Sequence, residues 1–322
     1  MSFCAVGNSE IDSCFTKKQL MFIIDAYNEY HKKDKIQYTS SMPKKQLHHL
    51  IMSRFNDRCK GKEYCLLDQP FLLEYKPHMS DMINPDRHDL NLNEEMKIYY
   101  YTFKPEEPIT PRKLSYEYTW LSNIDIVNVM RQYEEIFPNF RFFGPLPTDF
   151  QEIMHIMVAD VCKQKNTIAN LYRKGIRRIG LIINLDKHGE PGSHWVAIFI
   201  DLTDKINKET DQHTIEYFDS VGNNPNKYIK DYITHVCKRV NENTNIKYPT
   251  EVKNKIKKLV NVIPHQKQNT ECGVYSMFYI VSRLYGKTFD DICGKNVKPI
   301  RDEEIHKFRK LFFRPTRYTN YS

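Results

Sequence analysis

The spacing of apolar residues in the first third of the chain is typical of amphipathic helices. Over residues 17–33, apolar side chains recur at intervals of three and four, and a threonine precedes them at the N-cap position. Residues 43–54 repeat the pattern and begin with a proline, which is favoured at a helix start. Three prolines within residues 105–111 then interrupt the chain. We therefore predict a mostly helical N-terminal domain over residues 1–110 and a second domain over residues 111–322.

From residue 120 onward, short apolar runs alternate with segments that have a helical repeat, which predicts strands alternating with helices. The predicted strands span residues 140–143, 176–185, 194–202, 214–218 and 259–264. The predicted helices follow residue 122 and span residues 149–172, 225–240 and 273–285. The last of these helices is apolar on nearly every side until Arg283, as in helices buried at the centre of a domain. This order predicts an α+β fold in which a central mixed sheet packs against the buried helix.

Composition narrows the class of protein. The chain has 322 residues, of which 40% are hydrophobic and 27% charged, as in globular proteins. No apolar run approaches the ~20 residues of a membrane span, and the N-terminus lacks a secretory signal pattern, so we expect neither a membrane span nor secretion. Lysine and arginine (48) exceed aspartate and glutamate (40), and the net charge of +8 is a modest surplus that favours acidic partners or nucleic acid. Eight cysteines without a signal peptide suggest reduced thiols.

Three short motifs place reactive side chains at the ends of predicted elements. His194 opens one predicted strand and Asp219 ends the next, so antiparallel pairing would bring the imidazole and the carboxylate together. Cys272 immediately precedes the buried helix, where unpaired N–H groups and the helix dipole favour a thiolate. A nucleophilic cysteine requires these groups: a base that takes its proton and a third group that orients the base. His213 and His265 are alternative bases on chemistry alone, but neither stands in a matching motif.

A hydrogen-bond donor that stabilises the negatively charged oxygen of the reaction intermediate is expected in the loop before Cys272. Gln266, six residues before Cys272, could donate its side-chain N–H groups together with the backbone N–H of Cys272. Gln268 and Asn269 compete for this role, because both are amides in the same loop. All three residues could also be simple loop amides.

In these motifs the chain resembles the clan of ubiquitin-like-protein proteases and adenovirus-type maturation proteases. That clan has His-Trp on one strand, Asp or Asn at the end of the next, and a Gln before an acidic-Cys-Gly turn. The corresponding residues here are His194-Trp195, Asp219, Gln266 and Glu271-Cys272-Gly273. Segments 194–199, 215–220 and 270–276 are most similar to the polyprotein-processing cysteine proteases of African swine fever virus and its giant-DNA-virus relatives. The resemblance extends over about residues 120–312.

This resemblance implies a cysteine endopeptidase that acts through Cys272, His194 and Asp219, with Gln266 in the oxyanion hole and with no metal or cofactor. Viral members of the clan cut structural polyproteins after paired glycines during particle maturation, so the implied locations are the virion and the host cytoplasm. Such substrates fit a cleft that is too narrow for side chains, and the resemblance makes Trp195 the candidate for lining it. The implied fold is a cysteine protease core with the buried helix behind the nucleophile.

Other interpretations remain open. Cellular members of the clan release ubiquitin-like modifiers, so a deubiquitinase or modifier protease is the main alternative. A basic nucleic-acid-binding or scaffold protein with a protease-like fold is a third hypothesis, and adenovirus-type relatives suggest stimulation by nucleic acid. Residues 1–110 are expected to dock substrate or to regulate the site. Cys59 and Cys65, with His48 and His49 upstream, invite a zinc interpretation, but their spacing favours structural thiols.

Overall fold

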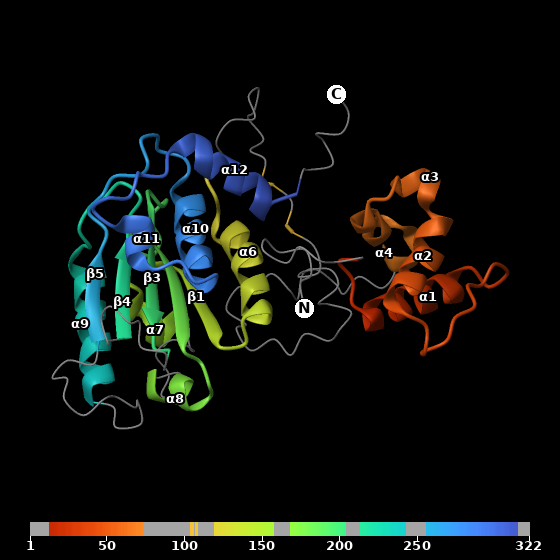
Figure 1. Cartoon of the computed structure of the whole chain (residues 1–322), viewed down its shortest axis with the longest axis horizontal. Helices are drawn as coiled ribbons and strands as arrows, with labels where there is room; N and C mark the ends of the chain where they lie inside the picture. Colours follow the sequence, from red (N-terminus) through yellow and green to blue (C-terminus); the bar gives the residue numbers. More distant parts are fainter. Residues whose placement is uncertain are drawn as a thin grey trace. The chain divides into compact units, whose positions relative to one another are not determined.

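The chain forms two compact units. The structure, a computed structural model, describes residues 13–73, 104–105, 107–108, 119–157, 168–203, 213–242 and 256–314. Contacts along the chain divide it into Met1–Pro105 and Glu106–Ser322, and Figure 1 shows the elements of each unit. The boundary predicted from the sequence lies between residues 110 and 111.

The N-terminal unit consists of short helices around an apolar centre. The helices are α1 (Lys17–Tyr30), α2 (Lys44–Arg54), α3 (Asn56–Cys59), the 3-10 helix η1 (Glu63–Asp68) and α4 (Pro70–Leu73). Helix α1 begins with a capping box, because the side chains of Thr16 and Gln19 each accept the backbone N–H of the other residue. The core includes Phe15, Leu20, Ile23, Ile24, Leu47, Ile51 and Phe71. The helical N-terminal region predicted from apolar spacing is therefore confirmed.

One cysteine pair in this unit is oxidised, contrary to the expectation of reduced thiols. Helix α3 is followed by two residues with positive φ, Lys60 (φ 47°) and Gly61 (φ 75°), at which the chain turns back. This turn brings the Cα atoms of Cys59 and Cys65 to 5.4 Å, and their sulfur atoms form a disulfide bond. The zinc interpretation is contradicted as well, because the two sulfurs are bonded to each other. Sequence spacing could not reveal a contact that depends on the turn.

The C-terminal unit is built on a five-stranded mixed sheet (Figure 1). The strands are β1 (Phe140–Pro147), β2 (Arg178–Asn184), β3 (Trp195–Asp201), β4 (His213–Phe218) and β5 (Ile256–Val260), and they lie side by side in chain order. The central pairs β2–β3 and β3–β4 are antiparallel, whereas the outer pairs β1–β2 and β4–β5 are parallel. The predicted mixed sheet is thus confirmed, with β5 starting and ending earlier than expected.

Helices cover both faces of this sheet. One layer consists of α7 (Phe150–Met157), α8 (Ile168–Arg173) and α9 (Lys227–Glu242), whose apolar residues share a core with Leu181, Ile198 and Ile215 of the strands. The predicted helix over residues 149–172 is therefore represented by α7 and α8, and residues 158–167 lie outside the described ones. The other layer consists of α6 (Asn123–Ile136) and α10 (Cys272–Leu284), which pack against each other and against the sheet. Two more helices, α11 (Phe289–Cys293) and α12 (Asp302–Phe312), follow, and α12 packs against α10.

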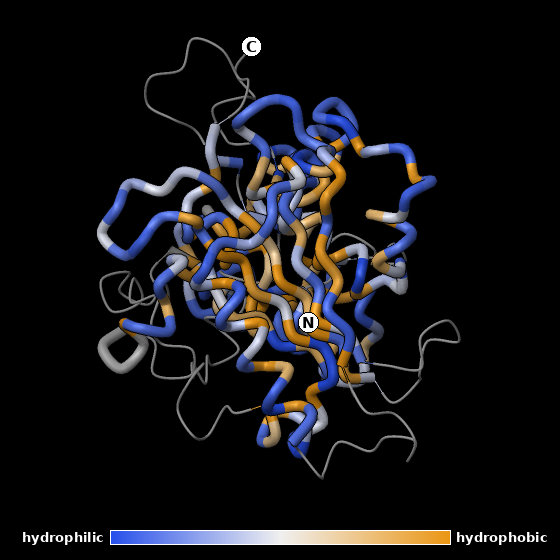
Figure 2. Tube along the Cα trace, turned by 90° about the vertical axis from the view of Figure 1, so that its left-hand side faces the viewer, coloured by the Kyte–Doolittle hydropathy of each residue, from blue (hydrophilic) through white to orange (hydrophobic). Residues whose placement is uncertain are grey.

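Burial follows the predicted pattern. Nearly every residue of α10 is buried, which confirms the prediction of a helix at the centre of the domain. In Figure 2 the strands of the sheet are largely hydrophobic, and many of the outer turns are hydrophilic. Among the residues that the structure describes, no helix has the length and apolarity needed to cross a membrane.

Candidate active site

The antiparallel pairing of β3 and β4 brings His194 to Asp219. In the register, Ala197 on β3 lies opposite Phe218 on β4, so the residue just before β3 and the residue just after β4 meet at one edge of the sheet. His194 Nε2 lies 2.7 Å from Asp219 Oδ1, and the carboxylate is fully buried. Oδ1 also accepts the backbone N–H of Val221 at 3.0 Å, which fixes the carboxylate. The structure therefore unites the predicted imidazole and carboxylate.

Cys272 joins them from the central helix. It is the first residue of α10, where backbone N–H groups have no partner within the helix and the helix dipole is positive. Helix α10 packs against β3, and Cys272 lies close enough to His194 to raise the pKa of its imidazole. Since Nε2 of the imidazole faces Asp219, Nδ1 is left for the sulfur. The thiol is only 3% exposed, so water has little access to it.

The surroundings of His194 favour the imidazolium form. Burial on its own lowers the pKa of a histidine, but hydrogen bonds to Asp219 and Cys272 and the charges of both groups outweigh it. The pKa of His194 is raised from 6.5 to about 9. At neutral pH the ring therefore carries two protons, and a positive charge beside the sulfur stabilises a thiolate. The site therefore places a cation beside the sulfur of Cys272.

Gln266 lies in the loop between β5 and α10, close to the residue that follows Asp219. Its side chain is 4% exposed, whereas Gln268 and Asn269, the two alternatives, are exposed. Ser220 Oγ donates to Gln266 Oε1 at 2.6 Å, and Gln266 Nε2 donates to the backbone carbonyl of Gln268. Of the three candidate amides, Gln266 is therefore the one that the fold fixes beside the His194–Asp219 pair.

Other contacts that the sequence analysis missed hold this loop. Asn261 Nδ2 donates to the backbone carbonyl of Asp219 at 2.8 Å, so the chain leaves β5 at this residue instead of continuing the strand. Asp302 Oδ2 accepts the backbone N–H groups of Lys267 (3.0 Å) and Gln268 (3.1 Å). No sequence motif connects these residues, because their partners lie 34 to 42 positions away.

Gly222 allows the turn after Asp219 to approach this loop. The residue has φ +79°, and a Cβ on it would lie 3.0 Å from backbone atoms of Val262, Ile263 and Pro264. Both the conformation and the space therefore require glycine. The strong turn chemistry of the segment after Asp219 was the signal in the sequence for this feature.

The predicted cleft residue Trp195 lies beside the first turn of α10, which contains Cys272 and Gly273. Its indole N–H donates to the carbonyl of Leu121 at 3.1 Å, and its side chain is 7% exposed. A Cβ on Gly273 would lie only 3.2–3.3 Å from Leu121 and Trp195 side-chain atoms, so the turn after Cys272 packs tightly against both. The neighbouring Trp120 is 46% exposed and offers an aromatic surface to solvent. The role of Trp195 in lining a cleft stays a prediction.

The two alternative bases occupy different environments. His265 is buried, its Nδ1 accepts the backbone N–H of Ile300, and burial with the charge of Arg301 lowers its pKa to about 4. It is therefore neutral at physiological pH. His213 begins β4, whereas Asp219 follows the end of that strand, a separation of roughly 20 Å along an extended chain. Neither histidine lies where it would complete the arrangement at Cys272.

A buried arginine holds Glu271, the residue before Cys272. Glu271 is fully buried and accepts from Arg309 Nη1 of α12 at 2.9 Å. Arg309, itself 1% exposed, also donates through Nε to Glu107 at 3.1 Å and through Nη2 to the carbonyl of Thr119. The guanidinium of Arg309 on α12 thus contacts both Glu271, just before α10, and the first residues of the C-terminal unit.

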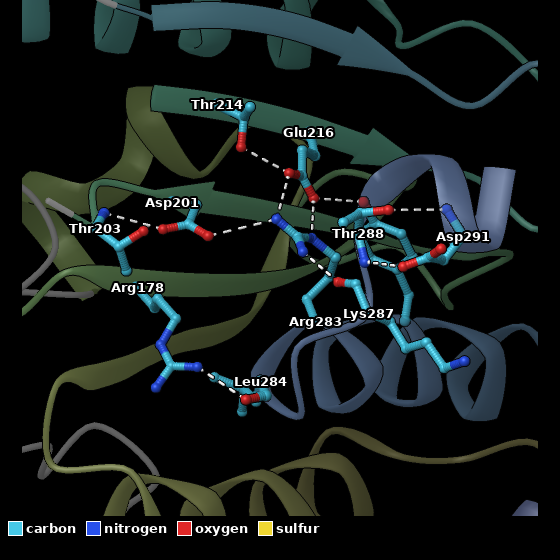
Figure 3. A network of polar contacts seen from close by, with 11 residues as sticks. Arg178, Asp201, Thr203, Thr214, Glu216, Arg283, Leu284, Lys287, Thr288 and Asp291 are labelled. Atoms are coloured by element: carbon cyan, nitrogen blue, oxygen red, sulfur yellow. Dashed lines mark hydrogen bonds and ion pairs between the residues drawn. The ribbon is translucent and has the colours of Figure 1, made fainter. Parts of the chain in front are cut away.

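A second buried charge network ties α10 to β4 (Figure 3). The Glu216 carboxylate on β4 accepts from Arg283 Nε at 2.7 Å and Nη2 at 2.9 Å, and from Thr214 Oγ1 at 2.6 Å. Tyr279 Oη donates to it at 2.6 Å, and burial and the nearby Glu216 charge raise the pKa of Tyr279, so the phenol keeps its proton. The helix that carries Cys272 and the strand that leads to Asp219 are thereby fixed relative to each other.

Comparison with known proteins agrees with this geometry. A family model described as the Ulp1 protease family, C-terminal catalytic domain, matches residues 155–314. A protein of Acanthamoeba polyphaga mimivirus that is named as a thiol protease is 31% identical over 95% of this chain and 91% of its own length. A cysteine protease of African swine fever virus is 35% identical over 136 residues, which are 42% of this chain and 43% of that protein.

A crystal structure of an African swine fever virus protease has the same fold. Its TM-score is 0.59 at 23% identity, and the match covers 97% of this chain and 96% of that one. The fold and these relatives place the protein among the cysteine proteases. More particularly, the chain belongs to the Ulp1 protease family. The predicted protease fold and enzyme class are therefore confirmed.

Proposed function

We propose that this protein is an endopeptidase that cleaves viral structural proteins after Gly-Gly, with Cys272 as nucleophile, His194 as base and acid, and Asp219 as the group that orients His194. The observation that carries the proposal is the chain of contacts from Asp219 through His194 to Cys272. Residues from three elements that are distant along the chain converge there. We further propose the virion and the host cytoplasm as sites of action, because the matched relatives are viral proteins.

Each step of the reaction uses groups of this chain. The thiolate of Cys272 attacks the carbonyl carbon of the substrate, a C–S bond forms, and the carbonyl oxygen becomes an oxyanion. The backbone N–H of Cys272 and the amide of Gln266 stabilise that charge. The C–N bond then breaks as the His194 imidazolium gives its proton to the leaving amine. Water, deprotonated by His194, attacks the thioester, and the C–S bond breaks to restore the thiolate.

The packing around the nucleophile supports a preference for glycine. Cys272 is 3% exposed, and the residue that follows it packs tightly against Leu121 and Trp195, since a Cβ on Gly273 would lie 3.2–3.3 Å from their side-chain atoms. A substrate segment that reaches such a buried sulfur gains by having no side chains. Two consecutive glycines satisfy that condition, and they also adopt backbone conformations that other residues rarely do.

The test compares three fluorogenic peptides that differ only before the cut bond, with Gly-Gly, Ala-Gly or Gly-Ala at the two positions. We expect the full-length protein to cleave the Gly-Gly peptide at least about 10-fold faster than the others, since each added methyl group must be accommodated in a packed site. Cys272→Ala provides the blank. Equal rates for all three peptides would contradict the Gly-Gly proposal while leaving the protease class intact.

Release of a ubiquitin-like modifier is the second candidate. An African swine fever virus relative that is 35% identical over 42% of this chain is named SUMO-1 cysteine protease. Modifier–fluorophore conjugates separate the two candidates. If the folded modifiers raise kcat/KM far above that of the Gly-Gly peptide, the second candidate is favoured; similar values favour polyprotein processing.

Replacing Asp219 with asparagine is expected to move the alkaline limb of the activity profile to lower pH. The pKa of His194 is about 9 in part because Asp219 accepts its hydrogen bond and bears a negative charge. His194 is an imidazolium below that pKa and loses its positive charge as pH rises through it. Asparagine keeps a hydrogen-bonding oxygen but removes the charge, so the pKa of His194 falls. The measurement is kcat/KM from pH 6 to 10, and an unchanged alkaline limb would exclude this role for Asp219.

A further inference from the structure

We propose that Ser220 is a positioning residue that fixes the carboxamide of Gln266 so that one of its N–H groups remains directed to the oxyanion. The inference rests on the proposed function and adds a residue to the same site. Ser220 directly follows Asp219 and is 1% exposed. It is placed to connect the group that orients the base with the loop that stabilises the intermediate.

Three hydrogen bonds connect Ser220 to this loop. Its backbone carbonyl accepts the N–H groups of His265 and Gln266, each at 2.8 Å. Its hydroxyl donates to Gln266 Oε1 at 2.6 Å. The first two contacts hold the backbone and do not depend on the side chain. The third is the only one of the three that acts on the carboxamide.

The partners of Gln266 determine which way its amide faces. Its nitrogen lies next to the carbonyl oxygen of Gln268, which can only accept a hydrogen bond. Rotating the amide by 180° would place two oxygens against each other, so the nitrogen must face Gln268 and the oxygen must face Ser220. The Ser220 hydroxyl is then obliged to donate. One N–H of the amide is used by Gln268, and the second stays available for substrate.

The hydroxyl has two effects on that second N–H. It prevents rotation of the amide, because the buried Oε1 would lose its partner. It also polarises the amide, since a hydrogen bond accepted by the oxygen makes the nitrogen a stronger donor. Without the hydroxyl, the backbone of the loop stays in place through the Ser220 carbonyl and Asp302. Loss of the hydroxyl should therefore affect the donor geometry and leave the fold unchanged.

A double-mutant cycle in the full-length protein tests this inference with the Gly-Gly peptide. Gln266→Ala is expected to lower kcat about 100-fold or more. Ser220→Ala is expected to lower kcat about 10-fold with KM nearly unchanged, since it disturbs the donor without removing it. In the Gln266→Ala background, Ser220→Ala is expected to change kcat by less than about twofold. A full 10-fold loss in that background, or wild-type kcat in the single variant, would overturn the inference.

Ser276→Ala is the matched control. Ser276 is also 1% exposed and lies on α10, but its hydroxyl has no hydrogen-bond partner among the described residues. Its removal is expected to leave kcat within about twofold. The rate of Cys272 alkylation by iodoacetamide should also be unchanged in Ser220→Ala, because alkylation forms no oxyanion. A parallel loss of alkylation would show damage to the nucleophile and would contradict the inference.

The role of Ser220 can be tested even if the proposed Gly-Gly cleavage is wrong. If the wild-type protein does not cleave the Gly-Gly peptide, the small aldehyde acetylglycinal replaces it, because its reversible adduct with Cys272 also places an oxygen in the oxyanion hole. Protection of Cys272 from iodoacetamide then reports how tightly the adduct forms. Ser220→Ala is expected to weaken protection about 10-fold in the wild-type background and to have no further effect after Gln266→Ala. Equal weakening in both backgrounds would refute the role of Ser220.

Discussion

Replacing Cys272 with alanine is expected to lower peptide hydrolysis by a factor on the order of 10⁴ or more. In the proposed mechanism the sulfur is the atom that forms the covalent bond, and neither the imidazole nor the oxyanion donors can replace it. Because the side chain is small and partly surrounded by backbone at the start of α10, the fold should persist. Turnover of the Gly-Gly peptide and the melting temperature, measured together, separate loss of chemistry from loss of structure.

The other buried thiols provide matched controls for this prediction. Cys237 on α9 and Cys293 on α11 are also free and buried, and burial raises the pKa of each. Alanine at either position should leave kcat within about twofold. Iodoacetamide near neutral pH should label Cys272 before Cys237 and Cys293, because only Cys272 faces an imidazolium. Hydrolysis at a wild-type rate by Cys272→Ala would refute the nucleophile assignment.

Replacing Glu216 with alanine is expected to destabilise the protein by about 3–5 kcal/mol, the typical cost of leaving a buried charge unpaired. The carboxylate is fully buried, and it is the partner of Arg283, whose side chain is 9% exposed, and of Tyr279. Removing it leaves the guanidinium inside the protein with the longer ion pair to Asp201 at 3.4 Å and the backbone carbonyl of Lys287. Chemical denaturation, followed by circular dichroism, measures the change in the free energy of unfolding.

The double variant Glu216→Leu/Arg283→Met is the control for this prediction. Exchanging both charges for apolar groups of similar size typically costs little or even stabilises, since neither charge then has to be desolvated. We therefore expect the double variant to be more stable than Glu216→Leu or Arg283→Met alone. A double variant that is as unstable as the sum of the two single losses would show that the residues do not act as a pair.

The sequence was sufficient for the main features of the site because they follow from regular elements. Antiparallel neighbours place the start of one strand beside the end of the next, so His194 and Asp219 meet. The apolar character of residues 273–285 predicted a central helix, and Cys272 lies at its start. Both features follow from the spacing of apolar residues and from the order of the strands along the chain, and both can be read from a single sequence.

Contacts made by loops and by isolated side chains were not predicted. Ser220 had strong turn chemistry around it, but its bond to Gln266 spans 46 positions and depends on the conformation of two loops. The Cys59–Cys65 disulfide likewise depends on the turn after α3. One signal was present and went unused: Glu216 and Arg283 are charged residues that interrupt apolar segments, and two such interruptions of opposite sign are candidates to pair inside the protein.

The guanidinium of Arg309 has a practical consequence for shortening this protein. Glu107 supplies one of its carboxylate partners and comes at the very beginning of the C-terminal unit. A fragment that starts at residue 111 would lack Glu107. Glu271, just before Cys272, would then be left to balance the buried charge of Arg309. Truncations intended to retain a working protease should therefore start upstream of Glu107.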